Sequence, residues 1–504
     1  MISGATLTTF IIYLIGMLII GWVAYKKTDN LSDYVLGGRR LGGAVAALSA
    51  GASDMSGWLL LGLPGYAYAA GMEATWICVG LALGAFLNWQ FVAKRLRIYT
   101  ELANDSITIP DFFENRFQDS SKLLRVISAF VILLFFTFYT SSGLVGGALL
   151  FENTFGLEYQ LALWIGALVI ISYTLLGGFL AVSWTDFFQG ILMFLALIVV
   201  PIVMIGNMGG WNETIQRIGT IDANRLDVFS GVGILGIISL MAWGLGYFGQ
   251  PHILTRFMAI KHHKEIPKAR FIGMTWMVIS LFGAIFTGFV GIAYFSGTPL
   301  TDAETVFIEA ANVLFHPVVS GFLLAAILSA IMSTIDSQLL VSSSAIAEDF
   351  YKVLIRPSAS SRELIWVGRF SVLVIALIAI FLAFDPESSV LDLVSYAWAG
   401  FGAAFGPIVI LSLFWKRMTR NGALVGMIVG AATVVIWKLL STPELDDAGV
   451  VIKEEMIPFE LYEIVPGFIL GFITIVVVSF IGKKPESSII DHFEKMETLL
   501  KSKS

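Results

Sequence analysis

Long stretches without charge separate the ionisable residues along most of this 504-residue chain. A lipid-facing segment must satisfy its own backbone hydrogen bonds and rarely carries charge, so each stretch predicts a membrane helix of about 20 residues. Thirteen candidates emerge, at residues 5–25, 42–70, 74–93, 123–150, 159–177, 184–206, 230–258, 271–296, 312–346, 364–384, 389–415, 421–440 and 462–482. Charged residues make up 13% of the chain, against roughly a quarter in soluble domains. The sequence therefore predicts an all-α polytopic membrane protein and excludes a water-soluble enzyme.

The basic residues are distributed unevenly between the two sets of connections. Of 31 Lys and Arg residues, 27 lie in alternate connections and their helix edges, at 26–40, 94–125, 256–270, 352–369, 416–420 and beyond 483. Because cytoplasmic connections are rich in Lys and Arg, this pattern predicts a multi-pass protein of the cell membrane with its N-terminus outside and its C-terminus in the cytoplasm. The longer connections 207–229, 297–311 and 441–461 are then external. The short amphipathic tail is expected at the inner surface or partly disordered.

Two of the predicted spans are interrupted. Segment 48–58 (LSAGASDMSGW) places a carboxylate, Asp54, among small residues within a span, and segment 243–251 (WGLGYFGQP) combines three glycines with a proline. Unwound backbone is tolerated at membrane depth only where it lines a protected cavity. Each interrupted span opens a block of five spans, and the odd number inverts the second block. Paired broken helices in corresponding halves predict a substrate and ion site near the midplane. Close helix packing by glycine is the alternative, but it does not require a buried carboxylate.

Six motifs are long enough to be specific: GGRRLG at 37–42, ALSAGASDMSGWLLLGLPG at 47–65, SWTD at 183–186, WGLGYFGQPHILTRFMA at 243–259, AILSAIMSTIDSQLLVSSSAI at 326–346 and SYAWAGFGAAFGP at 395–407. Over almost the whole chain the sequence resembles the sodium:solute symporter family and, within it, the bacterial sodium/proline group. The resemblance implies a leucine-transporter-type core of five plus five inverted helices, with one helix before it and two after it. It also implies secondary active transport of L-proline with sodium, no enzymatic activity, and no cofactor beyond sodium as a co-transported ligand.

The predicted organisation combines this resemblance with the span pattern. It comprises a first helix and inner loop (1–41), a five-helix repeat (42–206), an external loop (207–229), an inverted five-helix repeat (230–415), two further helices (416–482) and a cytoplasmic tail (483–504).

A sodium ion needs oxygen ligands, which unwound backbone near Ala52 and the hydroxyls of Ser333 and Thr334 would supply. On the residues alone, a Ser–Thr pair in a membrane helix is equally typical of interhelical hydrogen bonding. By resemblance, the sodium cage consists of Ala52, Met55, Ala330, Ser333 and Thr334. The resemblance also gives roles in sodium affinity and coupling to Asp54, Ser56 and Gly57.

Proline is a small zwitterion with an apolar ring, so its pocket is expected to combine aromatic walls with backbone donors at a broken helix. By resemblance, the residues that line it are Trp58, Tyr139, Trp243, Tyr247 and Pro251. Taken singly, each aromatic residue is equally consistent with the core or with an interfacial belt.

Three charged residues are candidates for gating and coupling. The resemblance places Arg39 at the inner gate, with a topology determinant as the alternative. Asp186 is expected in a tight inner turn between the fifth and sixth spans, where capping a helix is the alternative role. Asp336 departs from the family pattern and shares a helix face with Ser333. It is expected either to tune ion entry from the inner side or to pair with a Lys or Arg.

Other function classes find less support in the sequence. It contains neither H-E-x-x-H nor G-x-S-x-G, which argues against an intramembrane hydrolase, and no G-x-x-x-x-G-K-[ST] to bind a nucleotide. A channel would require repeated subunits around one pore. Within the family, another small solute (pantothenate, a sugar or an osmolyte) and a proton as the coupling ion stay open. The expected partners are proline, sodium and the lipid bilayer, with no nucleic acid; the oligomeric state is undetermined.

Overall fold

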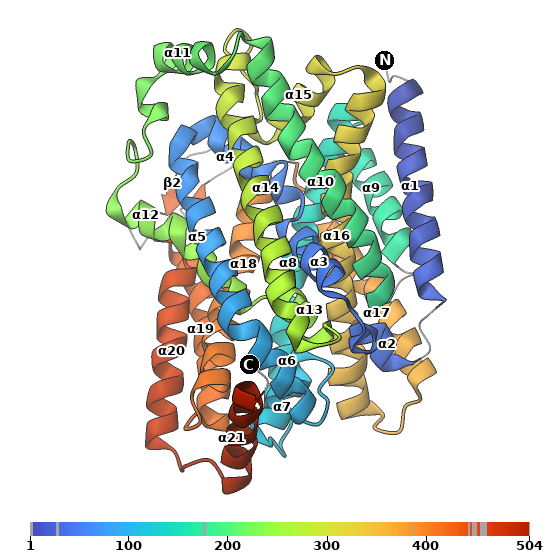
Figure 1. The fold of residues 1–504 in the computed structure, drawn as a ribbon, viewed down its shortest axis with the longest axis vertical. Helices are drawn as coiled ribbons and strands as arrows, with labels where there is room; N and C mark the ends of the chain where they lie inside the picture. The colour runs from blue at the N-terminus through green and yellow to red at the C-terminus, as the bar shows by residue number, and fades with distance from the viewer. Residues whose placement is uncertain are drawn as a thin grey trace.

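The computed structural model describes residues 4–26, 30–174, 178–386, 388–441, 444–445, 451–453 and 461–502. Most of its helices run along one long axis (Figure 1). The first part of the chain forms α1 (Gly4–Tyr25), α2 (Leu31–Leu36), α3 (Gly43–Met55), α4 (Gly62–Ala70), α5 (Thr75–Leu87), α6 (Ala93–Leu102), α7 (Ile109–Phe117), α8 (Leu123–Phe155), α9 (Tyr159–Thr174) and α10 (Phe179–Asn207).

The second part continues the bundle. It forms α11 (Trp211–Ile221), α12 (Ile234–Met241), α13 (Pro251–Ala259), α14 (Ile266–Tyr294), α15 (Val306–Leu314), α16 (Pro317–Ser344), α17 (Ser361–Leu382), α18 (Val390–Phe414), α19 (Arg420–Ser441), α20 (Ile464–Ile481) and α21 (Ser487–Ser502). Two short strands, β1 (Glu444–Leu445) and β2 (Val451–Lys453), pair antiparallel. The short helices α11 and α15 lie at one end of the bundle, and α7 and α21 lie at the other (Figure 1).

The first predicted interruption is present between α3 and α4. Helix α3 ends at Met55, Ser56 has a left-handed backbone conformation with φ of +46°, and a 3-10 turn over Gly57–Leu59 follows. Only glycine fits at position 57, because a Cβ there would lie 2.9 Å from Cγ1 of Ile331 on α16. The break and the close passage of α16 therefore occur at the same point.

The second interruption separates α12 from α13. A 3-10 stretch over Ala242–Phe248 joins them, and the two parts are bent by 43°. A Cβ on Gly244 would lie 2.1 Å from the carbonyl oxygen of Gly80, so glycine allows this stretch to contact α5. Pro251 begins α13, at a position where the missing amide hydrogen is tolerated. Helix α13 packs directly against α3, which brings the two broken spans together.

Helix α16 is the centre of the bundle. It packs against α1, α3, α8 and α10. From Leu323 to Ser344 nearly all of its residues are buried, including seven serines and threonines and the carboxylate of Asp336. Polar groups in such a position need partners from neighbouring helices, because no water reaches them. Those partners form the site described below.

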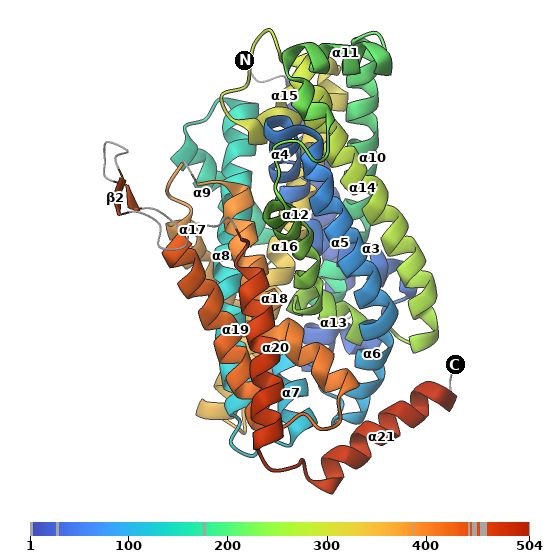
Figure 2. The same cartoon turned by 90° about the vertical axis from the view of Figure 1, so that its left-hand side faces the viewer.

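Each predicted span has a helical counterpart, and most ends agree within five residues. Among the described residues, ten helices are long and apolar enough to cross a membrane, or eleven if the bent pair α12–α13 counts as one span. Helices α3 and α9 are shorter, so the number thirteen stays a prediction. The termini lie at opposite ends of the bundle (Figures 1 and 2), as an odd number of spans requires. Most of the predicted connection 441–461 and the last residues of the span 159–177 lie outside the described residues.

Candidate ion and substrate site

Two hydroxyls of α16 point at one backbone carbonyl near the end of α3. Ser333 Oγ donates to the carbonyl oxygen of Ala52 at 2.9 Å, and Thr334 Oγ1 donates to the same oxygen at 3.4 Å. Ser333 Oγ also lies 3.1 Å from the carbonyl oxygen of Ala330. Because α3 ends at Met55, the last four carbonyl oxygens of the helix receive no hydrogen bond from an amide of the same helix. A buried cluster of oxygens of this kind suits a hard, dehydrated cation.

The other predicted ion-site residues lie at the same break. Met55 is buried, and the hydroxyl of Ser56 accepts a hydrogen bond from the backbone amide of Trp58 at 3.1 Å. The carboxylate of Asp54 accepts from Tyr247 Oη at 2.5 Å, and its backbone carbonyl accepts from Tyr139 Oη at 3.0 Å. Asp54 therefore links the oxygen cluster on α16 to the aromatic residues of the predicted pocket.

Those aromatic residues form a continuous cluster beside the two breaks. The rings of Trp58 and Trp243 stack with centroids 5.3 Å apart, and Trp243 stacks on Tyr462 at 5.5 Å. Trp398 packs edge-on to Tyr247 at 5.1 Å and donates its indole N–H to the carbonyl oxygen of Trp243 at 2.7 Å. Sequence reasoning missed Trp398 and Tyr462. Trp398 lies within the quoted motif at 395–407, whereas Tyr462 has no comparable signal.

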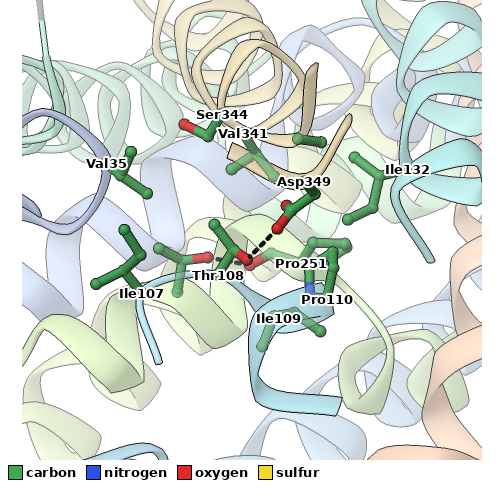
Figure 3. Close-up of a pocket in the computed structure, with 12 residues that line it drawn as sticks. Val35, Ile107, Thr108, Ile109, Pro110, Ile132, Pro251, Val341, Ser344 and Asp349 are labelled. Atoms are coloured by element: carbon green, nitrogen blue, oxygen red, sulfur yellow. Dashed lines mark hydrogen bonds between the residues drawn. The ribbon is translucent and has the colours of Figure 1, made fainter. Parts of the chain in front are cut away.

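Pro251 lines a small cavity of about 10 Å³, and none of the predicted aromatic residues is among the residues that line it with Pro251 (Figure 3). The cavity is lined by residues of α2, α8 and α13, by the start of α7, by the end of α16 and by the π-helical segment Ala345–Ile355 that follows α16. Thr108 donates to Asp349 Oδ1 at 3.1 Å across it. Its volume is about that of one water molecule.

A buried ion pair connects the two broken spans to α10 and α16. Arg256 Nη2 lies 3.1 Å from Asp186 Oδ2, and both side chains are fully buried. Ser49 of α3 donates to the same carboxylate oxygen at 2.7 Å and accepts from Arg256 Nε at 3.1 Å. Arg256 Nη2 also donates to Ser337 Oγ of α16 at 2.5 Å. One guanidinium thus joins α3, α10, α13 and α16.

This cluster corrects two expectations. Asp186 lies inside α10, which begins at Phe179, so the predicted inner turn and its capping role are wrong. Arg256, counted among the residues of an inner connection, lies inside α13 with no exposed surface. The sequence contains a signal for this ion pair, because an arginine within the predicted span 230–258 requires a partner inside the membrane. Asp336 Oδ1 accepts from Ser337 Oγ at 3.4 Å, and within the described residues Arg256 forms its ion pair with Asp186 and not with Asp336. Both alternatives for Asp336, ion entry and pairing, therefore stay predictions.

Arg39 links the connection between α2 and α3 to α13. Its guanidinium donates to the carbonyl oxygens of Met258 and Ser106, both at 2.8 Å, to Asp105 Oδ1 at 2.8 Å and to Thr100 Oγ1 at 3.2 Å. The Arg39 backbone has a φ of +53°, unusual for a side chain of this size. These four bonds join the segment before α3 to α6, to the segment after α6 and to α13.

A second arginine cluster, missed by sequence reasoning, surrounds Arg125 at the start of α8. Its guanidinium lies 2.6 Å from Asp349 and 3.2 Å from Glu348, both in the π-helical segment Ala345–Ile355 that follows α16. It also lies 3.2 Å from Asp111 and 3.1 Å from Glu114 of α7. Because one of these partners lines the cavity of Figure 3, the cluster holds α7 and the π-helical segment around that cavity.

A family model supplies the decisive comparison with known proteins. The model of the sodium:solute symporter family matches residues 34–430, which include both broken spans, α16 and the buried ion pair. The chain belongs to the sodium:solute symporter family. The similar family members are symporters, which are transporters and not enzymes. This chain is accordingly a multi-pass membrane transporter.

Relatives of this symporter-family chain are similar over nearly their whole length. It is 56% identical to the high-affinity proline transporter PutP of Bacillus subtilis, over 95% of this chain and 98% of that protein. It is 54% identical to the sodium/proline symporter of Escherichia coli, over 98% and 97% of the two chains. The osmoregulated proline transporter OpuE of Bacillus subtilis is 53% identical, over 98% of both chains.

Solved structures show the fold. A Na+-coupled sialic acid symporter in a substrate-bound, outward-open state aligns with a TM-score of 0.78 at 19% identity, over 96% of this chain and 99% of that one. The nucleobase-cation-symport-1 transporter MHP1 in a closed conformation aligns with a TM-score of 0.56 at 13% identity, over 93% and 99%. This symporter therefore has the leucine-transporter-type fold that the motifs implied.

Proposed function

We propose that this protein imports L-proline together with sodium by alternating access. The observation that carries the proposal is the meeting of two sets of groups at one helix break. Ser333 and Thr334 direct their hydroxyls at the Ala52 carbonyl, and Asp54 connects that position to Tyr247 and the adjoining tryptophans. The relatives that are more than half identical in sequence carry proline in their names, which supports proline as the solute.

The site consists of two adjoining subsites, one for sodium and one for proline. The sodium subsite uses oxygens and backbone of Ala52, Asp54, Met55, Ser56, Gly57, Ala330, Ser333 and Thr334. The substrate subsite uses Trp58, Tyr139, Trp243, Tyr247 and Pro251. Sodium is therefore a co-transported ligand rather than a cofactor. Because the aromatic faces lie next to the Asp54 carboxylate, the secondary ammonium of proline has both a ring face and an anion within one cluster.

The moving parts follow the predicted repeats, 42–206 and 230–415, with one helix before them and two after them. The N-terminus lies outside and the C-terminal tail lies in the cytoplasm, because the basic connections belong to the end that carries α7 and α21. Opening toward the cytoplasm separates α3 and α13 from α10 and α16. The Arg256–Asp186 pair, Asp336 and the bonds of Arg39 lie across or beside those contacts, so we assign them to the inner gate and to coupling.

The sodium gradient is sufficient for uphill transport. One positive charge moving through about 100 mV releases about 2.3 kcal/mol. A tenfold sodium gradient adds about 1.4 kcal/mol, and the sum of about 3.7 kcal/mol supports roughly 500-fold accumulation at one-to-one stoichiometry. Each ligand favours the state that the other binds, so sodium raises the affinity for proline and proline raises that for sodium by the same factor.

The test is uptake of labelled L-proline by purified protein in liposomes. We expect concentrative uptake when sodium is outside, none in potassium, and no effect of a pH difference alone. Excess unlabelled proline is expected to compete, whereas pantothenate, sugars and betaine are not. Uptake driven by a pH difference in potassium buffer would show that the coupling ion is the proton and not sodium. Stronger competition by another solute than by unlabelled proline would show that the other solute is the substrate.

A further inference from the structure

A large hollow lies at the end of α20, remote from the central site. Its volume is about 570 Å³. Four segments form its walls: the end of α7, the turn between α18 and α19, the end of α20, and the segment that leads into α21. Figure 2 shows where α7, α19, α20 and α21 lie in the bundle. The lining residues used below are Phe117, Met418, Val478, Ile481, Lys483 and Lys484.

Because α20 is long and apolar enough to span a membrane, its end would place the hollow where the hydrocarbon and headgroup layers meet. Helix α20 is apolar and ends at Ile481, whose side chain is 83% exposed. An exposed aliphatic side chain at the end of a membrane span contacts lipid chains rather than water. Two residues further on, Lys483 begins the charged segment. One wall is thus apolar and the adjoining rim is basic.

The rim favours an anion. Lys483 and Lys484 are exposed, and in the described part of the chain no carboxylate within 4 Å neutralises either of them. Arg420 also lines the hollow, but Asp119 pairs with it at 2.9 Å. Glu486 is the one carboxylate in the lining. The uncompensated charge therefore lies on the two lysines.

The floor of the hollow is closed by the protein. Phe117 and Met418 are 3% and 0% exposed, so their side chains are packed rather than mobile. Arg417 Nη2 donates to the carbonyl oxygen of Gly482 at 3.1 Å, which ties the end of α20 to the turn between α18 and α19. The volume also lies within the range of about 300–1,000 Å³ that is usual for small-ligand sites.

We propose that this hollow binds the phosphate headgroup of an anionic glycerophospholipid, with Lys483 and Lys484 on the phosphate and the acyl chains along Val478 and Ile481. Basic pockets at the ends of membrane helices recognise such headgroups. The site is separate from the transport site, and the proposal does not depend on the identity of the transported solute.

The test is lipid retention by the full-length protein, measured by native mass spectrometry in a neutral detergent with dioleoylphosphatidylglycerol or dioleoylphosphatidylcholine added. The wild type is expected to retain the anionic lipid selectively. Lys483→Ala/Lys484→Ala is expected to weaken that retention roughly 30-fold, about fivefold for each lysine near the membrane surface. Lys483→Arg/Lys484→Arg retains the charge and is expected to retain the lipid.

The matched control is Lys264→Ala/Lys495→Ala. It removes two exposed lysines at the same end of the bundle, neither of which lines the hollow. This variant is expected to retain the lipid like the wild type. Equal loss in both double alanine variants would mean a non-specific charge effect and overturn the proposal, as would unchanged retention in Lys483→Ala/Lys484→Ala. Displacement of the lipid by millimolar inorganic phosphate would overturn the proposal, because the hollow would then be a site for a free anion and not for a lipid. Size-exclusion profiles and thermal unfolding establish that each variant is folded.

Discussion

Replacing Ser333 by alanine is the sharpest test of the ion subsite. Its hydroxyl is fully buried and lies 2.9 Å from the carbonyl oxygen of Ala52 and 3.1 Å from that of Ala330. In the proposed cage the same hydroxyl oxygen faces the sodium ion. Removing it therefore takes one oxygen from the cage without changing the backbone of α3 or the aromatic cluster.

The size of the effect follows from two opposing contributions. A hydrogen-bonding group that faces a full charge contributes about 1.5–3 kcal/mol, and the bond to Ala52 in the ion-free protein contributes about 1 kcal/mol. The variant lacks both interactions, so its sodium affinity falls by the difference between them, about 0.5–2 kcal/mol. The sodium concentration for half-maximal uptake is thus expected to rise roughly 2- to 30-fold.

The assay is initial proline uptake by proteoliposomes over a range of sodium concentrations, at fixed voltage. Ser329→Ala is the matched control, because Ser329 is also fully buried on α16 but donates to Ala325 within its own helix at 2.8 Å. The control is expected to have the wild-type sodium dependence. An unchanged sodium dependence in Ser333→Ala, or an equal shift in Ser329→Ala, would refute the assignment of the cage.

Three further variants test the other parts of the site, and a fourth tests the ion pair of Asp119 with Arg420, outside the site. Trp243→Ala removes the stacked wall and is expected to raise the proline KM by roughly 2- to 30-fold, from about 0.5–2 kcal/mol of cation–π interaction; an unchanged KM would contradict the pocket. Asp186→Asn is expected to lower the unfolding temperature more than Asp336→Asn, because only Asp186 accepts directly from Arg256; the opposite order would contradict the pairing. Asp336→Asn is expected to alter the sodium dependence of efflux, and a wild-type dependence would remove Asp336 from the site. Burial acts to raise the pKa of Asp119, but hydrogen bonds and a nearby guanidinium outweigh it and lower that pKa. Asp119 then stabilises the folded protein above its ordinary pKa of about 3.9 and loses that effect as pH falls through its lowered pKa. Thermal unfolding of Asp119→Asn is expected to differ from the wild type at neutral pH and to converge with it in acid; a constant difference would contradict this sign.

The fold could be predicted because a membrane limits the choices. Uncharged stretches located the helices, and glycines beside a carboxylate at Asp54 or a proline at Pro251 located both breaks. These local signals suffice because lipid forces each segment to satisfy its own backbone. The ends of the helices are predicted less accurately than their centres. Helix α10 begins at Phe179, so Trp184 and Asp186 lie inside it and not in the predicted turn before it.

The partners of the buried charges could not be predicted in the same way. The sequence places Arg256 at the edge of the predicted span 230–258, where the inner connection 256–270 begins. Three-dimensional packing puts it beside Asp186 and Ser49 instead. Likewise, nothing in the local sequence indicates that Tyr462 stacks on Trp243. Such pairs join residues far apart in the chain, so they depend on how the helices pack and not on the sequence around either residue.

The central claim is that sodium and proline cross the membrane together through one site. The most direct measurement imposes an inward L-proline gradient on proteoliposomes with equal sodium on both sides and the voltage clamped at zero, and follows radioactive sodium. We expect proline entry to drive a transient accumulation of sodium above its outside concentration, and Ser333→Ala to reduce it. Proline entry with no accompanying movement of sodium would contradict the account.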